Sequence, residues 1–215
     1  MRYLLLGLIV AFFITSCGSG KVAYAWKGEA KAYMTKYQDM MLKGDRFQAS
    51  YYLKDAIKEA QNDISLRSLA TVYLGKCAIE KAVGIQTVCQ SYTDLKPLFN
   101  DTKFEAYKAM LLDEEVTDTT LLGKYQSFYE SLKAKNVGVS EIQSLDTIYA
   151  QSIAAMLALE KGQINMDIID YMIDKASSEN FKGLMLTWLK IAQKMATGEK
   201  KNRLDQKIKF LEIKP

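Results

Sequence analysis

The chain has 215 residues, with 29 Lys and Arg against 25 Asp and Glu, and it contains no histidine. This mildly positive charge is too small to indicate nucleic acid as a partner. The lack of histidine excludes histidine-based catalytic triads and histidine-ligated metal sites.

The first sixteen residues have the layout of a secretory signal peptide. A single charged residue, Arg2, precedes an uncharged apolar run from Leu4 to Ile14. That run is too short to span a membrane comfortably, since a spanning helix needs roughly 20 apolar residues. We therefore expect residues 1–16 to direct export and then to be removed.

The motif Ile14-Thr15-Ser16-Cys17 follows the apolar run directly. It resembles the lipobox of bacterial lipoproteins, in which an aliphatic residue and two small residues precede a cysteine. The resemblance covers the first seventeen residues and implies cleavage before Cys17 and lipidation of its sulfur. It also implies the outer membrane, facing the periplasm, because Gly18 rather than Asp follows the cysteine. An ordinary signal peptide or an uncleaved helix, with Cys17 incidental, is the alternative.

Two or three acyl chains on Cys17 would anchor the protein stably, so the expected membrane contact is through a lipid anchor and not through a spanning helix. Residues 17–25 are then a tether that begins with the short flexible segment Gly18-Ser19-Gly20. The remaining chain, residues 26–215, is long enough for one well-packed core.

Residues 26–215 are expected to be all-α. Proline occurs only at positions 97 and 215, and apolar residues recur every three or four positions in segment after segment. The segment that ends near Lys161 is apolar on nearly all sides, which is typical of a central helix. The periodicity predicts helices over about 26–43, 46–61, 63–77, 85–96, 102–111, 118–132, 140–161, 168–173, 181–192 and 204–211.

Three sequence signals suggest how particular helices begin. Asp63 precedes the third helix and is its expected N-cap. Two segments with the spacing of a capping box, Thr102 to Glu105 and Ser140 to Gln143, are expected to open later helices.

The segment Gly44 to Ala49, followed by Leu53 and Ala56-Ile57, resembles the turn and second helix of a tetratricopeptide unit. The preceding helix matches less well, because Tyr37 stands where a small residue belongs. The resemblance is moderate over 26–90 and weak beyond, and it implies stacked antiparallel helical hairpins. An irregular helical bundle is the alternative, and either architecture is all-α.

Cys77 and Cys89 are predicted to form a disulfide. They lie twelve residues apart, with Val83-Gly84 midway, where one helix is expected to turn into the next. An exported protein meets an oxidising compartment, which permits the bond, and closing so short a loop contributes about 2–3 kcal/mol in the chain-entropy model. Two separate buried thiols are the alternative.

Aromatic residues are the most suggestive candidates for binding a partner, because stacked hairpins present extended surfaces and aromatic side chains dominate binding hot spots. Tyr51 and Tyr52 are the best pair, since adjacent helix positions cannot both face the core. Core packing or scattered surface exposure is the alternative for each. The candidate groove residues are Tyr33, Tyr37, Tyr51, Tyr52 and Tyr73.

The sequence contains no phosphate-binding glycine loop and no Gly-x-Ser-x-Gly motif, so we predict no cofactor, no metal and no catalysis. The acidic clusters at 113–115 and at Asp167, Asp170 and Asp174 are expected to be solvated faces. The expected function is that of a membrane-anchored, non-catalytic adaptor or assembly factor that holds a protein or peptide partner in the cell envelope. A carrier or enzyme with a pocket for a lipid or a cell-wall fragment is the alternative.

Overall fold

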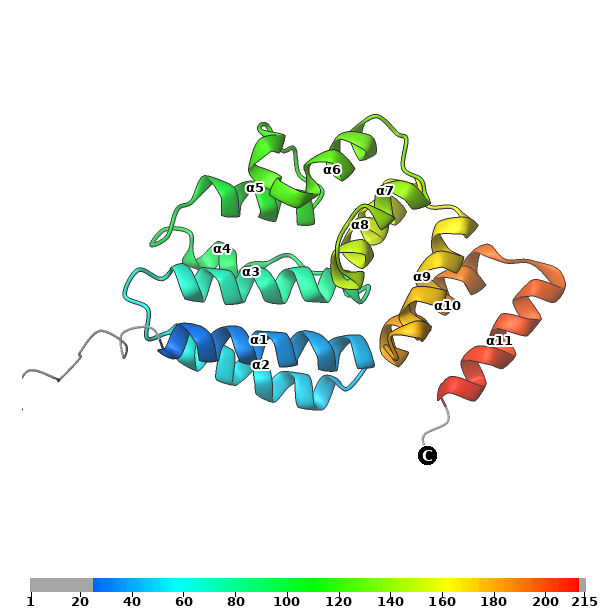
Figure 1. Cartoon of the computed structure of the whole chain (residues 1–215), viewed down its shortest axis with the longest axis horizontal. Coiled ribbons are helices and arrows are strands. Elements are labelled where there is room, and N and C mark those ends of the chain that lie inside the picture. Colours follow the sequence, from blue (N-terminus) through cyan, green and yellow to red (C-terminus); the bar gives the residue numbers. More distant parts are fainter. Residues whose placement is uncertain (1–24, 213–215) are drawn as a thin grey trace, which may run out of the picture.

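The structure, a computed structural model, describes residues 25–212, and these residues form eleven α-helices and one 3-10 helix with no strand among them (Figure 1). The predicted all-α fold class is therefore confirmed. The predicted signal peptide, the lipidation site Cys17 and residues 17–24 of the predicted tether lie outside the described part of the chain. The helices are α1 (Ala25–Lys43), α2 (Arg46–Ala60), α3 (Arg67–Ala82), α4 (Gln90–Leu95), α5 (Thr102–Leu111), η3 (Thr119–Tyr125), α6 (Gln126–Lys133), α7 (Val139–Gln143), α8 (Ile148–Glu160), α9 (Met166–Ser178), α10 (Lys182–Met195) and α11 (Gly198–Glu212).

Helices α1 and α2 form a tight antiparallel hairpin, and α3 lies alongside it (Figure 1). The turn uses Gly44 at a positive φ of 89°, and the Asp45 carboxylate caps α2 by accepting a hydrogen bond from the Gln48 N–H at 3.0 Å. Ala49 and Ala56 are fully buried, and these small side chains permit the close approach of α1 and α2. This hairpin is the part of the chain that resembles a tetratricopeptide unit.

The hairpin pattern does not continue regularly after α3. Helix α3 ends at Ala82, and just beyond it Gly84 has a positive φ and the Ile85 N–H donates a hydrogen bond to the Glu80 carbonyl. This six-residue closure is a standard helix end. The predicted helix over 85–96 is reduced to α4, because the β-branched residues of 85–88 have low helix propensity and Cys89 adopts a left-handed conformation with φ of 50°.

Helix α8 occupies the centre of the fold, as its apolar composition predicts. All of its residues from Ile148 to Ala158 except Tyr149 are buried. Its polar members have partners: the Ser152 hydroxyl donates to the Ala82 carbonyl at 2.6 Å, and the Gln151 amide donates to the Leu145 carbonyl at 2.8 Å. These bonds join α8 to the end of α3 and to the preceding loop.

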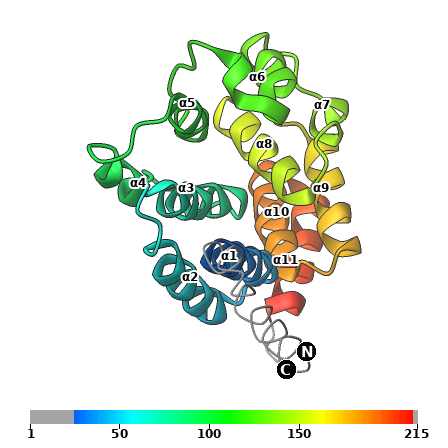
Figure 2. The same cartoon turned by 60° about the vertical axis from the view of Figure 1, so that its left-hand side comes forward.

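Helices α9 and α10 form a second packed pair, and α11 lies at the edge of the molecule (Figures 1 and 2). In Figure 1 these helices are steeply inclined to α1, α2 and α3, so the molecule has two differently oriented groups of helices with α8 between them. Gly183 of α10 packs against the α1–α2 turn, where its Cα lies next to Gly44. Between residues 25 and 212, no helix combines the length and the apolar character needed to cross a membrane.

Two of the three predicted helix starts need correction. The N-cap of α5 is Asp101, which accepts hydrogen bonds from the N–H groups of Lys103 and Phe104, so Thr102 is the first helical residue and caps nothing. The N-terminus of α7 is capped by Glu141, whose carboxylate accepts a hydrogen bond from the Gly138 N–H at 2.8 Å. Gln143, which was expected to take part in the capping box, is the last residue of the helix.

The third predicted start, Asp63, lies three residues before Leu66, which holds the N-cap position of α3. Helix α3 begins at Arg67, but the Asp63 carboxylate accepts hydrogen bonds from the N–H groups of Ser65 and Ser68, at 3.0 and 2.9 Å. It therefore satisfies a backbone donor in the first turn of α3, as predicted, while Leu66 occupies the position that flanks the helix.

Candidate functional site

An exposed aromatic pair lies on the solvent side of α2. Phe47 and Tyr51 are one helical turn apart, and their ring centroids lie 5.0 Å apart in an edge-to-face arrangement. The two residues are 71% and 56% exposed, which makes them unlike the buried aromatic residues of the core. We call Phe47 and Tyr51 the aromatic pair.

Two lysines extend the surface of the aromatic pair along the same face of α2. Lys54 and Lys58 follow Tyr51 at three and seven positions, so they lie on the same stripe of the helix, and both are exposed. An aromatic surface next to two lysines favours a partner that presents apolar groups beside carboxylates.

Tyr33 and Tyr52 are brought together across the hairpin by a lysine. The Lys36 ammonium lies 5.7 Å from the centre of the Tyr33 ring and 5.4 Å from the centre of the Tyr52 ring. Both tyrosines are half-buried. A cation between two ring faces is attracted by both, so this contact fixes the relative position of α1 and α2 at the surface.

The prediction that Tyr37 lines a partner-binding groove is wrong. Its side chain is only 3% exposed and belongs to the core, so it cannot contact a partner on the folded surface. Burial first, and then the nearby Glu80 carboxylate, raise the pKa of the Tyr37 hydroxyl well above its ordinary value. The physical reason for its burial is the close packing of α1, which turns this position toward α3 and α8.

Tyr73 lies on α3, half-buried against the core. Among the described side chains it shares no ring contact or side-chain hydrogen bond with the other four candidate tyrosines. The structure therefore places Tyr33, Tyr51 and Tyr52 on one hairpin and leaves Tyr73 apart from them.

Phe47 is the residue that the sequence-based search for a binding surface missed. Because Ala49, Ala56 and Ala60 define the buried side of α2, the opposite side of the helix must carry Phe47 and Tyr51. The helical phase alone could therefore have identified Phe47.

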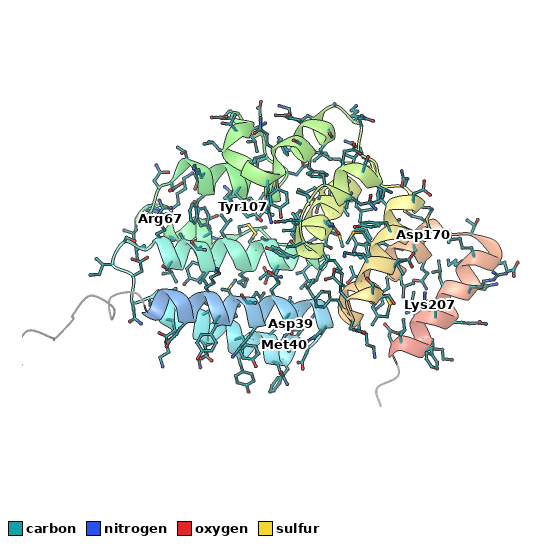
Figure 3. All side chains as sticks on the ribbon, in the orientation of Figure 1. Asp39, Met40, Arg67, Tyr107, Asp170 and Lys207 are labelled. Carbon is teal, nitrogen blue, oxygen red and sulfur yellow. A yellow bond between two sulfur atoms is a disulfide. The ribbon has the colours of Figure 1, made fainter. Side chains whose placement is uncertain are left out.

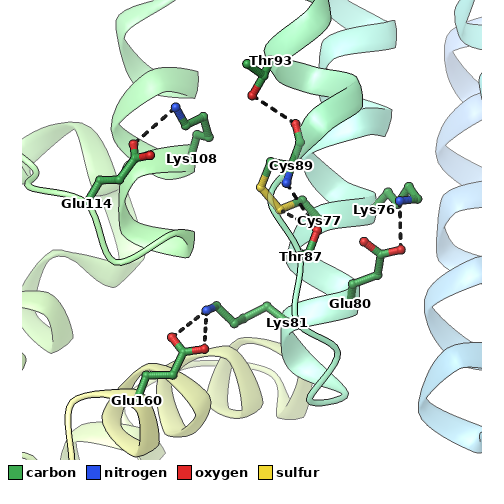
Figure 4. The surroundings of a disulfide bond; sticks show 10 residues. All are labelled: Lys76, Cys77, Glu80, Lys81, Thr87, Cys89, Thr93, Lys108, Glu114 and Glu160. Atoms are coloured by element: carbon green, nitrogen blue, oxygen red, sulfur yellow. Dashed lines mark hydrogen bonds and ion pairs between the residues drawn. A yellow bond between two sulfur atoms is a disulfide. The ribbon is translucent and has the colours of Figure 1, made fainter.

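The predicted disulfide is present between Cys77 of α3 and Cys89 (Figure 4). The Cα atoms lie 5.2 Å apart, and both residues are buried. The turn at Val83-Gly84 lies where the sequence predicts it, but the returning arm is an irregular segment instead of a helix. The bond fastens this segment to α3.

A cavity of about 600 Å³ opens where the α1–α2 turn meets the ends of α3 and α8 and one side of α10. We call it the basic cavity, because four cationic side chains and a single carboxylate line it. The cations are Arg46, Lys81, Lys190 and Lys194, the carboxylate is Glu160, and the apolar lining comes from Met41, Val83, Ile85, Met156, Leu159, Leu186 and Ile191.

A second hollow, of about 400 Å³, runs between α1 and α3. Its floor is largely apolar and includes Met34, Val72 and Ile79, with Tyr149 of α8 at its base. Arg67 (labelled in Figure 3) lies at this hollow, but its guanidinium already pairs with Asp101 at 2.5 Å and lies over the Phe104 ring.

Three half-buried or buried tyrosines of α5, η3 and α8 lie close together. The rings of Tyr107 and Tyr125 lie 5.7 Å apart, and burial raises the pKa of Tyr107 to about 12. Burial also raises the pKa values of Tyr125 and Tyr149. Phenols with such raised pKa values stay protonated near neutral pH, so they are poor general bases.

Two carboxylates of the acidic cluster at 113–115 pair with lysines. Asp113 pairs with Lys161 at 2.6 Å, and Glu114 pairs with Lys108 at 3.3 Å (Figure 4). Within residues 25–212, no group of three or more His, Cys, Asp or Glu side chains is arranged to hold a metal ion.

Comparison with known proteins found no matching family model, no similar curated protein and no similar solved structure. The function must therefore be argued from the geometry of this chain.

Proposed function

We propose that this protein is a membrane-anchored, non-catalytic adaptor that holds a protein partner on the aromatic pair of α2. The partner segment presents apolar groups flanked by carboxylates. Lipidation at Cys17 would tether the domain to a membrane of the cell envelope, facing an extracytoplasmic space. Seven residues lie between Cys17 and Ala25, and the eight Cα-to-Cα steps of such a tether span at most about 27 Å when fully extended.

The observation that carries the proposal is the exposure of Phe47 and Tyr51. Burying apolar surface is worth about 25 cal/mol per Å², so two large rings held in solvent leave a substantial driving force for association. Aromatic side chains are also the residues that most often carry binding energy in protein interfaces.

The charge around the aromatic pair supports the choice of an acidic partner segment. Lys54 and Lys58 continue the stripe of the aromatic pair along α2 and are exposed. Positive charge beside an apolar contact accelerates encounter with an acidic segment and disfavours basic ones.

Site-specific photocrosslinking in intact cells tests the proposal. A crosslinkable residue at position 51 should trap one defined partner. The double variant Phe47→Ala/Tyr51→Ala should weaken binding of that partner by about 30-fold or more, since truncating a hot-spot residue costs about 2 kcal/mol. Because both side chains are exposed, the variant should fold normally.

A matched control carries the crosslinker at Lys207, an exposed position on α11 (Figure 3). The control should trap no partner or a different one. Equal trapping from both positions, or unchanged affinity in the double variant, would exclude the aromatic pair as the docking surface.

A further inference from the structure

The basic cavity has a polar mouth and an apolar floor. Arg46, at the start of α2, and Lys194, near the end of α10, are exposed at the mouth, while Val83 and Met156 are buried beneath it. The α1–α2 turn and α10 that form its two sides lie against each other through Gly44 and Gly183. The cavity is therefore framed by rigid helix ends.

Two of the four cations in the basic cavity are already neutralised by carboxylates. Lys81 is buried and contacts both oxygens of Glu160, at 2.6 and 2.7 Å (Figure 4). Lys190 pairs with Glu212 of α11 at 2.7 Å.

Arg46 and Lys194 remain as the two lining cations that have no carboxylate partner among the described residues. The charged groups that are available to a ligand are therefore these two cations, and both lie at the mouth of the cavity. An anion there would gain charge-assisted hydrogen bonds, particularly from the planar guanidinium group.

We propose that the basic cavity binds a single-chain amphiphile with an anionic headgroup, the headgroup at Arg46 and Lys194 and the aliphatic chain against the apolar floor. A volume of about 600 Å³ lies within the range of small-molecule sites, which are mostly apolar with a few polar groups that orient the ligand. This binding is independent of the aromatic pair, because the two surfaces share no residue.

The two parts of the ligand follow from two different features of the cavity. An inorganic anion would leave the surface of Leu159, Leu186 and Ile191 in water, so it would gain only the electrostatic part. A neutral lipid would bury that surface but would leave the two cations without a partner. Only an amphiphile with a negative headgroup satisfies both.

Calorimetric titration of the purified domain with decyl phosphate tests the proposal. Decyl phosphate should bind at one site, and both 1-decanol and inorganic phosphate should bind at least about tenfold more weakly, since each lacks one part of the interaction. Equal affinity for decanol would overturn the anionic headgroup, and equal affinity for inorganic phosphate would overturn the aliphatic chain.

Paired variants locate the binding site. Arg46→Gln/Lys194→Gln should weaken decyl phosphate binding at least about tenfold. Lys54→Gln/Lys58→Gln, which removes the same charge from exposed sites outside the cavity, should leave it unchanged. A decrease that is equal in the two double variants would mean non-specific attraction and would overturn the proposal.

A third variant fills the cavity without changing charge. Leu186→Trp should abolish binding, while Met185→Trp on the neighbouring position of α10, which does not line the cavity, should retain it. Circular dichroism confirms that each variant is folded. Undiminished binding by a folded Leu186→Trp protein would place the aliphatic chain elsewhere.

Discussion

Asp63 shows how one side chain can begin a helix from outside it. Its carboxylate accepts hydrogen bonds from two backbone N–H groups and from the Ser65 hydroxyl, the last at 2.7 Å. Burial alone would raise the pKa of Asp63, but these hydrogen bonds outweigh it and lower the pKa from 3.8 to about 2. The charged form of Asp63 is therefore favoured in the folded state.

The sign of the pH dependence follows from that lowered pKa. A carboxyl group whose pKa is lower in the folded than in the unfolded chain stabilises the fold fully above its unfolded pKa. The stabilisation is lost as the pH falls from about 4 through about 2.

We predict that Asp63→Ala lowers the free energy of unfolding by about 1–2 kcal/mol at neutral pH, with a difference that narrows as the pH falls toward 2. Denaturant unfolding at a series of pH values measures it. Asp174→Ala, at an exposed position of α9, is the control and should change stability by less than about 0.5 kcal/mol. A difference that is the same at every pH would contradict the role of the carboxylate.

Glycine is required at position 183 because the main chain of α10 lies very close to the main chain of the α1–α2 turn. A Cβ at this position would lie 2.5 Å from both the Cα and the N of Gly44. Such a contact cannot be relieved by a side-chain rotation, because the neighbouring atoms belong to the main chain.

We predict that Gly183→Ala destabilises the protein by about 1–3 kcal/mol, as overpacking typically does, and that thermal unfolding records the loss. Gly28→Ala is the matched control, because nothing lies within 4 Å of a Cβ there. That helical position should gain about 0.5–1 kcal/mol from the substitution. If both variants were equally stable, the packing of α10 on the α1–α2 turn would not be as described.

Whether a prediction about a single residue succeeded depended on how near in the sequence the contacts that determine its role lie. Asp63 was identified as the side chain that caps the first turn of α3 because its partners lie within five residues, but the N-cap position itself is held by Leu66. Thr102 was wrong because Asp101, an equally good cap, stands beside it. Tyr37 was wrong because its burial depends on α3 and α8, which are distant in the sequence.

At the scale of elements, the segment between α3 and α4 departs most from its sequence pattern. The spacing of apolar residues over 85–96 is helical, but the chain from Ile85 to Val88 is irregular and is held by the disulfide at Cys89. Periodicity correctly indicated that Cys89 and Tyr92 face the core, but not that Val88 is 70% exposed. It does not distinguish a helix from a segment held against the core by a covalent bond.

We predict that removing the disulfide with Cys77→Ser/Cys89→Ser lowers the free energy of unfolding by about 2–3 kcal/mol. The segment around Val88, which is 70% exposed, should also become more susceptible to protease. Comparing urea unfolding with and without a reducing agent measures the effect, and the double variant should not respond to the reductant. Two free thiols in protein that has never been reduced would contradict the bond.

At the scale of the whole molecule, the all-α class and the central position of α8 could be predicted because composition and periodicity act along the entire chain. A tight antiparallel hairpin is formed by α1 and α2, where Ala49 and Ala56 are fully buried and allow the close packing. Beyond α3, the helices from α4 to α7 are short and do not recur at a constant interval along the chain. Their arrangement depends on tertiary contacts that a single sequence does not reveal.

The aromatic pair and the basic cavity also differ in how far they could be predicted from the sequence. The aromatic pair lies on one helix and could be found from helical phase. The basic cavity is assembled from four separate parts of the chain, from Met41 to Lys194, and no local sequence motif predicts it. A site of this kind is recognised only when the helix ends are placed together.

The proposed adaptor role depends on attachment to a membrane through Cys17. Mass spectrometry of the intact protein, extracted with detergent from the membranes of its native cells, tests this most directly. The account predicts a polypeptide that begins at Cys17 and carries the added mass of two or three acyl chains. A polypeptide that begins at Met1, carries no acyl mass and is recovered from the cytosol would contradict it.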